Sequence, residues 1–156
     1  MDRQTAFPDY PELYEQWFKE NNHLFDAEVE AIRALFPASD AGKSIEIGVG
    51  TGLFAARLGI KNGVEPADKM RATAQARGIE VVDAVAEDLP EGDQTYHTAL
   101  MVTVDCFLTD VDRAFKEARR ILAPLCCSLV VKYSPCLHQS YSCQVTNSSG
   151  FFFILR

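Results

Sequence analysis

A glycine-rich turn that follows a carboxylate is the part of this chain with the most definite chemical meaning. Glu46 stands two residues before the first of three alternating glycines, Gly48, Gly50 and Gly52. Glycines spaced in this way allow a tight turn from a strand into a helix and leave bare backbone for a ligand. A carboxylate beside that turn would repel the anionic pyrophosphate of a dinucleotide and attract a cation. The spacing E-x-G-x-G-x-G therefore favours S-adenosylmethionine (SAM), which has a cationic amino group and sulfonium and no phosphate, over NAD.

A second carboxylate, Glu65, follows 19 residues later at the end of a predicted short strand, directly before Pro66. At the tip of the second strand of a Rossmann-like sheet, a carboxylate can accept hydrogen bonds from both ribose hydroxyls of an adenosine. The proline can place an apolar edge against the base. The same carboxylate could instead cap the helix predicted for residues 67–77, since negative charge is favourable at a helix N-terminus. The agreement between motif and context favours the ribose contact.

Helices and strands alternate along the sequence and would position these carboxylates. Apolar periodicity and capping residues predict helices at 9–20, 26–36, 53–58, 67–77 and 111–122. Short apolar runs predict strands at 45–47, 63–65, 79–82, 98–103 and 129–131. Strands separated by helices form parallel sheets with both faces covered. We therefore predict the α/β class, as a Rossmann-like three-layer sandwich with a mostly parallel central sheet, an N-terminal helical cap, and C-terminal strands that are incomplete or atypical.

Four motifs, in this order, carry a resemblance to a known family. They are the glycine motif with Glu65, the segment from Ala86 to Pro90, the strand end at 100–103, and the helix 110–122 with its R-x-L ending. Together they resemble the class I SAM-dependent methyltransferases, and most closely a small-molecule branch similar to the quinone-biosynthesis methyltransferases. The resemblance implies S-adenosyl-L-methionine as cofactor and S-adenosyl-L-homocysteine as product. It also implies in-line transfer of the methyl group to a small-molecule acceptor.

The resemblance assigns cofactor-binding roles residue by residue. Glu46 would orient the amino group through water, the glycines would present backbone to the methionine and ribose parts, and Glu65 would hold the ribose hydroxyls. The adenine would meet the backbone of Ala86 and the carboxylate of Glu87 or Asp88. The whole predicted cofactor-binding set is Glu46, Gly48, Gly50, Gly52, Glu65, Pro66, Ala86, Glu87, Asp88 and Thr103.

The acceptor side of the predicted site is less defined. The resemblance implies a pocket between the N-terminal helices and the residues after the fourth strand. Tyr10, Tyr14 and Trp17 could form an aromatic lid there, and a role in helix packing is equally compatible with them. Phe107 is expected near the cofactor or the lid. Asp105 is the one nearby candidate for a general base, although a solvated loop acid is the simpler interpretation.

Composition bounds the remaining possibilities. The 156 residues and 47% hydrophobic content suit one domain, with a helical cap at 1–40, a cofactor-binding core at 41–124 and an atypical tail at 125–156. The net charge of −7 argues against a nucleic-acid partner. The sequence shows neither a secretory signal nor a run of ~20 apolar residues that would span a membrane. We therefore expect a cytoplasmic protein.

The tail departs from the family pattern. All 22 acidic residues lie at or before Glu117, and the glycine turn expected after the R-x-L helix is missing. Either residues 141–146 and 151–155 form a divergent hairpin, or the ending is truncated or frame-shifted, which we favour slightly. The cysteines of the tail match no metal-ligand spacing, so we predict no metal site. Two functions stay open beside methyl transfer. One is a cofactor-binding or inactive remnant, and the other, disfavoured by Glu46, is an NAD-type oxidoreductase.

Overall fold

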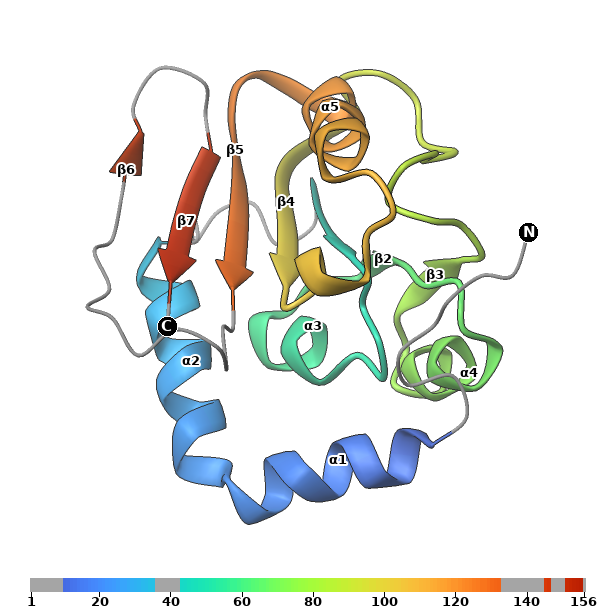
Figure 1. Cartoon of the computed structure of the whole chain (residues 1–156), viewed down its shortest axis with the longest axis vertical. Helices are drawn as coiled ribbons and strands as arrows, with labels where there is room; N and C mark the ends of the chain where they lie inside the picture. The colour runs from blue at the N-terminus through green and yellow to red at the C-terminus, as the bar shows by residue number, and fades with distance from the viewer. Residues whose placement is uncertain (1–9, 36–42, 133–144, 147–150, 156) are drawn as a thin grey trace.

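One sheet organises the fold (Figure 1). The structure is a computed structural model and describes residues 10–35, 43–132, 145–146 and 151–155. Within these residues a seven-stranded sheet has the order β3-β2-β1-β4-β5-β7-β6, and neighbouring strands are parallel except β6 and β7. The strands are β1 Ser44–Ile47, β2 Asn62–Val64, β3 Glu80–Val82, β4 Tyr96–Val102, β5 Leu122–Lys132, β6 Val145–Thr146 and β7 Phe151–Leu155. The predicted α/β class with a mostly parallel sheet is confirmed.

Helices pack on both faces of this sheet, which gives the predicted three layers. Alternate residues of β4 point to opposite faces. Leu100 and Val102 join a core with α2, α3 and α4, whereas Ala99 and Met101 join a core with α5. Helix α1 crosses the edge of the sheet to which the arrowheads of β4, β5 and β7 point (Figure 1). The helices are α1 Pro11–Glu20, α2 Asn22–Leu35, α3 Leu53–Leu58, α4 Asp68–Ala76 and α5 Val111–Ile121, with a short 3₁₀ helix, η2, at Asp105–Phe107.

The passage from α5 into β5 differs most from the prediction. The strand predicted at 129–131 is β5, which begins directly after α5. Leu122 has extended backbone (φ −87°, ψ 133°) while its N–H still donates to the carbonyl of Arg119. Tyr96 pairs with Leu122 but Thr98 pairs with Cys127, so an irregularity in β5 takes up the intervening residues. Because no left-handed residue is needed at Leu122, the chain passes from α5 into β5 without the glycine turn that the sequence lacks.

Other boundaries shift by a few residues. Helix α2 begins at Asn22, four residues before the predicted start, and β4 begins at Tyr96, two residues before. Pro11 occupies the first turn of α1, as predicted, because its missing N–H would have no partner there. The predicted capping residue Asp9 lies outside the described residues.

In the tail, β6 and β7 pair antiparallel, as in the hairpin interpretation, and β7 lies parallel to β5. The interpretation of a truncated or shifted ending stays a prediction. The tail residues considered as metal ligands lie outside the described side chains. None of the helices in the described part of the chain is long and apolar enough to cross a membrane.

Candidate functional site

The reversal of strand order between β1 and β4 marks the expected ligand edge of the sheet. β2 and β3 extend from one side of β1, and β4 and β5 extend from the other. In open parallel sheets, ligands bind beyond the carboxyl ends of the strands at such a switch point. The glycine turn follows β1 and therefore lies at this position.

Three glycines shape the turn with left-handed backbone. Gly48, Gly50 and Gly52 have φ values of 72°, 57° and 82°, which other residues adopt at a cost. A Cβ on Gly48 would lie 2.6 Å from a methyl carbon of Val104, and one on Gly52 would lie 2.5 Å from Cδ1 of Ile79. Both positions therefore need glycine for close packing as well as for backbone conformation.

Gly50 differs from the other two glycines because its outer face is open. Among the described residues, one atom lies within 4 Å of the place that a Cβ would take there, and it is the hydroxyl oxygen of Tyr14, at 4.0 Å. The N–H of Gly50 points elsewhere and donates to Oε2 of Glu65 at 2.9 Å. The face of Gly50 at the Cβ position is thus open, and its role in binding a ligand stays a prediction.

Glu65 joins two turns that follow different strands. Its other carboxylate oxygen, Oε1, accepts from the N–H of Ala67 at 2.9 Å, directly before α4. Burial raises the pKa of Glu65, and the hydrogen bonds from Ala67 and Gly50 act against this rise. The hydrogen bond from Ala67 therefore supports the interpretation that Glu65 caps α4. An ionised carboxylate offers about four acceptor positions, so the predicted ribose contact stays compatible with these two bonds.

Glu46 is a buried carboxylate on β1 with an unsatisfied oxygen. Only 2% of the residue is exposed, and Oε2 has no hydrogen-bond partner among the described residues. Burial raises the pKa of Glu46 well above its usual range, a hydrogen bond from Ala55 lowers it, and the charge of Glu65 raises it further. Buried acceptors are nearly always hydrogen-bonded, so an orphan beside an open turn is suited to a ligand that brings a donor or a positive charge.

Helix α1 places an aromatic hydroxyl at this turn. The ring of Tyr14 packs edge-on against Phe18, with ring centroids 4.9 Å apart, and Phe18 packs in turn on Phe25 and Phe54. Burial, followed by the charges of Glu46 and Glu65, raises the pKa of Tyr14. The structure brings Tyr14 beside the glycine turn, and its predicted role in the acceptor pocket stays a prediction.

The remaining aromatic candidates, Tyr10, Trp17 and Phe107, are exposed. Tyr10 is 60% exposed and Trp17 is 42% exposed, and the Trp17 ring contacts Phe18 with centroids 5.0 Å apart. Trp17 therefore combines a packing contact with a large exposed surface. Phe107, in η2, is 43% exposed.

The segment after β3 holds the predicted adenine contacts in three different environments. Ala86 is buried in the core beside α5. Oε1 of Glu87 accepts from the backbone N–H groups of Thr109 and Asp110, at 2.7 and 3.3 Å. The side chain of Asp88 is 81% exposed and lies 3.9 Å from Arg113. Glu87 thus ties this segment to the residues before α5, while Asp88 faces solvent.

The end of β4 carries a strained residue. Thr103 has φ 53°, a left-handed conformation that is rare for a β-branched residue. Strained backbone persists where the surrounding structure enforces it, and such positions cluster at functional sites. The next residue, Val104, is the one that packs on Gly48, and Asp105 begins η2 directly afterwards.

A family comparison decides what these elements belong to. Residues 45–126 match the model of a methyltransferase domain family. This chain is a member of that methyltransferase family. The match covers β1 with its glycine turn, Glu65, the segment after β3, β4 and α5, which are the elements that form the site described above.

Relatives and solved structures agree with this assignment. An uncharacterised protein of Methanocaldococcus jannaschii is 40% identical over 118 residues, which are 76% of this chain and 56% of that protein. A SAM-dependent methyltransferase of Thermotoga maritima, a possible histamine N-methyltransferase, is 44% identical with a TM-score of 0.71, over 75% of this chain and 55% of that one. The [4+2]-cyclase SpnF is 25% identical with a TM-score of 0.60, over 70% of this chain and 46% of that one. This chain thus spans about half the length of these proteins.

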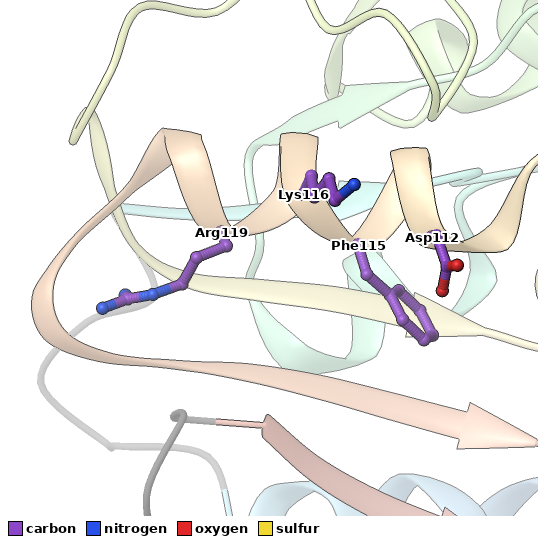
Figure 2. A pocket seen from close by; sticks show the side chains of 4 residues that line it. All are labelled: Asp112, Phe115, Lys116 and Arg119. Atoms are coloured by element: carbon purple, nitrogen blue, oxygen red, sulfur yellow. The ribbon is translucent and has the colours of Figure 1, made fainter.

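A surface hollow of this chain lies on α5 (Figure 2). Its lining residues are Asp112, Phe115, Lys116 and Arg119. None of these four belongs to the predicted cofactor or acceptor set, so the hollow is separate from the site at the glycine turn.

Proposed function

We propose that this protein binds SAM at the glycine turn and transfers its methyl group to a small-molecule acceptor. The observation that supports this most directly is the buried, unsatisfied oxygen of Glu46 next to the open backbone of Gly50. The residues suit SAM because its positive charge would compensate a carboxylate oxygen that is left unsatisfied. A dinucleotide would bring its pyrophosphate toward Glu46, so this carboxylate disfavours an NAD-type oxidoreductase.

Each part of the cofactor has a proposed partner among these residues. Glu46 orients the amino group through water, the turn of Gly48 and Gly50 presents backbone to the amino-acid end with its open face at Gly50, and Glu65 accepts from the ribose hydroxyls. Pro66, Gly52 and Thr103 complete the cradle, while Ala86 and the carboxylate of Glu87 or Asp88 meet the adenine. The bound cofactor would supply an electrophilic methyl group on a sulfonium, and the sulfur becomes a neutral thioether when the methyl group is transferred. The chain itself mainly contributes alignment of the reactants, which can supply ~7–11 kcal/mol of barrier lowering.

The acceptor is proposed to be a small molecule that enters between α1 and the end of β4. Tyr10, Trp17 and Phe107 offer exposed aromatic surface for it, and Asp105 is the proposed carboxylate that orients it or accepts its proton. A quinone-biosynthesis-like acceptor follows from the motif resemblance. An amine acceptor is suggested by the Thermotoga maritima relative, which is a possible histamine N-methyltransferase.

Calorimetric titration of S-adenosylhomocysteine into the whole chain tests the binding part of the proposal. We expect micromolar affinity in the wild type and a loss of about tenfold or more in Glu65→Gln, because a charged acceptor for the ribose is removed. Asp68→Asn is the matched control. It neutralises a carboxylate whose side chain is 87% exposed on α4, and its affinity should match the wild type. A folded wild type that binds NAD more tightly than S-adenosylhomocysteine would contradict the proposal.

Methyl transfer itself requires an acceptor screen. The SpnF neighbour shows that a related chain can have another chemistry. Mass spectrometry of products from SAM with a panel of phenols, quinols and small amines should show one class gaining a methyl group. Binding of the cofactor without turnover of any acceptor would favour the cofactor-binding remnant.

A further inference from the structure

We infer that Glu117 and Arg120, near the end of α5, are positioning residues for recognition of the adenine base, because they hold the backbone of the segment after β3. This inference deepens the proposed function and rests on it. Neither residue belongs to the predicted cofactor-binding set, and neither is proposed to touch the ligand. They act through Leu89, which directly follows the predicted adenine contacts along the chain.

The side chains of Glu117 and Arg120 bind both polar backbone groups of Leu89. The N–H of Leu89 donates to Oε2 of Glu117 at 3.0 Å, and its carbonyl oxygen accepts from Nη2 of Arg120 at 2.8 Å. The two side chains are also joined to each other, because Nε and Nη2 of Arg120 donate to the two carboxylate oxygens of Glu117, at 2.8 and 2.7 Å. Charge-assisted, bidentate pairs of this kind are strong and directional. We call this arrangement of Leu89, Glu117 and Arg120 the clasp.

Arg120 has all of its hydrogen-bond donors engaged in and around the clasp. A guanidinium carries five N–H groups in a rigid fork. Besides its three bonds to Glu117 and Leu89, Nη1 of Arg120 donates to the carbonyl oxygen of Glu91 and to Oδ1 of Asp93, both at 2.8 Å. A lysine at this position would keep the positive charge, but its single nitrogen with three donors could not bind all of these acceptors.

The clasp and a second contact attach the predicted adenine-binding segment to both ends of α5. As described above, one oxygen of Glu87 accepts from two N–H groups just before this helix. Asp88 lies between the two attachments, and its N–H donates to the carbonyl of Val85 at 3.1 Å. The side chain of Asp88 is 81% exposed, which favours it over Glu87 as the carboxylate that accepts from the exocyclic amine of adenine. The clasp on Leu89 fixes the backbone from which this carboxylate projects.

A fixed backbone matters for the choice between adenine and hypoxanthine. Adenine has an exocyclic amine, which donates hydrogen bonds, whereas hypoxanthine has an oxo group at the same position, which only accepts them. A carboxylate held at this position would face an acceptor and lose its hydrogen bond when hypoxanthine binds, so the site rejects that base. A segment released from the clasp can turn its carboxylate to water. Release should therefore reduce the preference for adenine more than it reduces binding of the rest of the cofactor.

Two ligands and Arg120→Lys test the inference. The ligands are S-adenosylhomocysteine and S-inosylhomocysteine, which differ only in the base, titrated calorimetrically into the whole chain. We expect the wild type to prefer the adenine ligand by about tenfold or more, since a hydrogen bond to a charged group depends on the base. Arg120→Lys should remove most of this preference and leave the affinity for S-inosylhomocysteine within about twofold of the wild type. Arg119→Lys, the same change at the exposed neighbouring residue, is the matched control and should change neither affinity.

Each other outcome has a definite meaning. If Arg120→Lys weakens both ligands equally, or neither of them, the inference is overturned, because the clasp then serves the fold alone. A wild type that binds both ligands equally well overturns the inference and leaves the proposed function standing. A wild type that binds neither ligand refutes the proposed function, and the inference falls with it. Should Arg120→Lys fail to fold, Glu117→Gln replaces it and must lower the preference for adenine by about threefold or more. An unchanged preference in that variant, or its failure to fold, overturns the inference.

Discussion

Gly63, on β2, should be intolerant of alanine although its backbone would accept it. A Cβ at this position would lie 2.9, 3.0 and 3.2 Å from three carbons of the Val49 side chain. Val49 is only 4% exposed, so it cannot move outward to make room. Overpacking of this kind costs about 1–3 kcal/mol, and the gain in strand propensity over glycine returns about 0.5–1 kcal/mol. Gly63→Ala should therefore destabilise the protein by up to about 2.5 kcal/mol.

The same substitution, Gly63→Ala, should also change the geometry of the glycine turn. Val49 stands between Gly48 and Gly50, and a displaced Val49 moves the turn that these glycines form. We expect Gly63→Ala to weaken binding of S-adenosylhomocysteine. Urea unfolding followed by the fluorescence of Trp17, the one tryptophan of the chain, measures stability, and calorimetry measures binding. Gly92→Ala is the control, because an added Cβ there would meet one flexible hydroxyl at 3.3 Å.

A double-mutant cycle with Val49→Ala separates the contact from other causes. Val49→Ala alone should cost about 1–3 kcal/mol, because two buried methyl groups are lost. In the double variant the smaller side chain removes two of the three close carbons, so the combined loss should be smaller than the sum by about 1 kcal/mol or more. Losses that add within about 0.5 kcal/mol, or a Gly63→Ala variant as stable as the wild type, would refute the packing argument.

Two further predictions concern charge. Because burial raises the pKa of Glu46 above the ordinary 4.5, the native state binds more protons than the unfolded state between that value and the raised pKa. The free energy of unfolding should therefore fall as pH rises through this window. Glu46→Gln should remove this pH dependence, and above the raised pKa it should be more stable than the wild type. A variant whose stability falls with pH as steeply as that of the wild type would contradict this prediction. Arg77→Gln breaks the ion pair with Glu15, whose side chains are 27% and 17% exposed. It should cost no more than about 1 kcal/mol in urea unfolding and weaken S-adenosylhomocysteine severalfold by loosening α1.

The control for the last variant is an ion pair elsewhere on the same helical layer. Arg57 and Asp26 tie α3 to α2 with 2.8 Å between the charged atoms, and their side chains are 44% and 56% exposed. Arg57→Gln should change stability by a similar or smaller amount and leave the affinity for S-adenosylhomocysteine unchanged. Equal loss of affinity in both variants would show that the effect is general and does not run through α1.

Local sequence patterns were sufficient for the sheet and for the turn. The spacing of Glu46, the glycines and Glu65 predicted a strand, a tight turn and a second strand, because glycine conformation and strand length are local properties. The family motifs added the segment after β3 and the helix before β5. These are the elements that the structure and the family match then placed together.

What the sequence did not show depends on packing between distant segments. The sequence around Gly63 does not predict its contact with Val49. The sequence around Tyr14 does not predict that its hydroxyl lies near Gly50. The strained backbone of Thr103 was equally hidden, because threonine is normal in a strand and its left-handed φ comes from its surroundings. The missing glycine turn left the course of the chain after the R-x-L helix open, and the structure shows extended backbone at Leu122 and pairing with β4.

The two hydrogen bonds of Glu65 have a thermodynamic consequence. By accepting from Gly50 and Ala67, one carboxylate fixes the spacing of two βα turns before any ligand is present. The entropy of ordering those turns is then lost during folding and not during binding. A ligand that fits this spacing would meet a preorganised site, and loosening the turns would appear chiefly as a less favourable entropy of association.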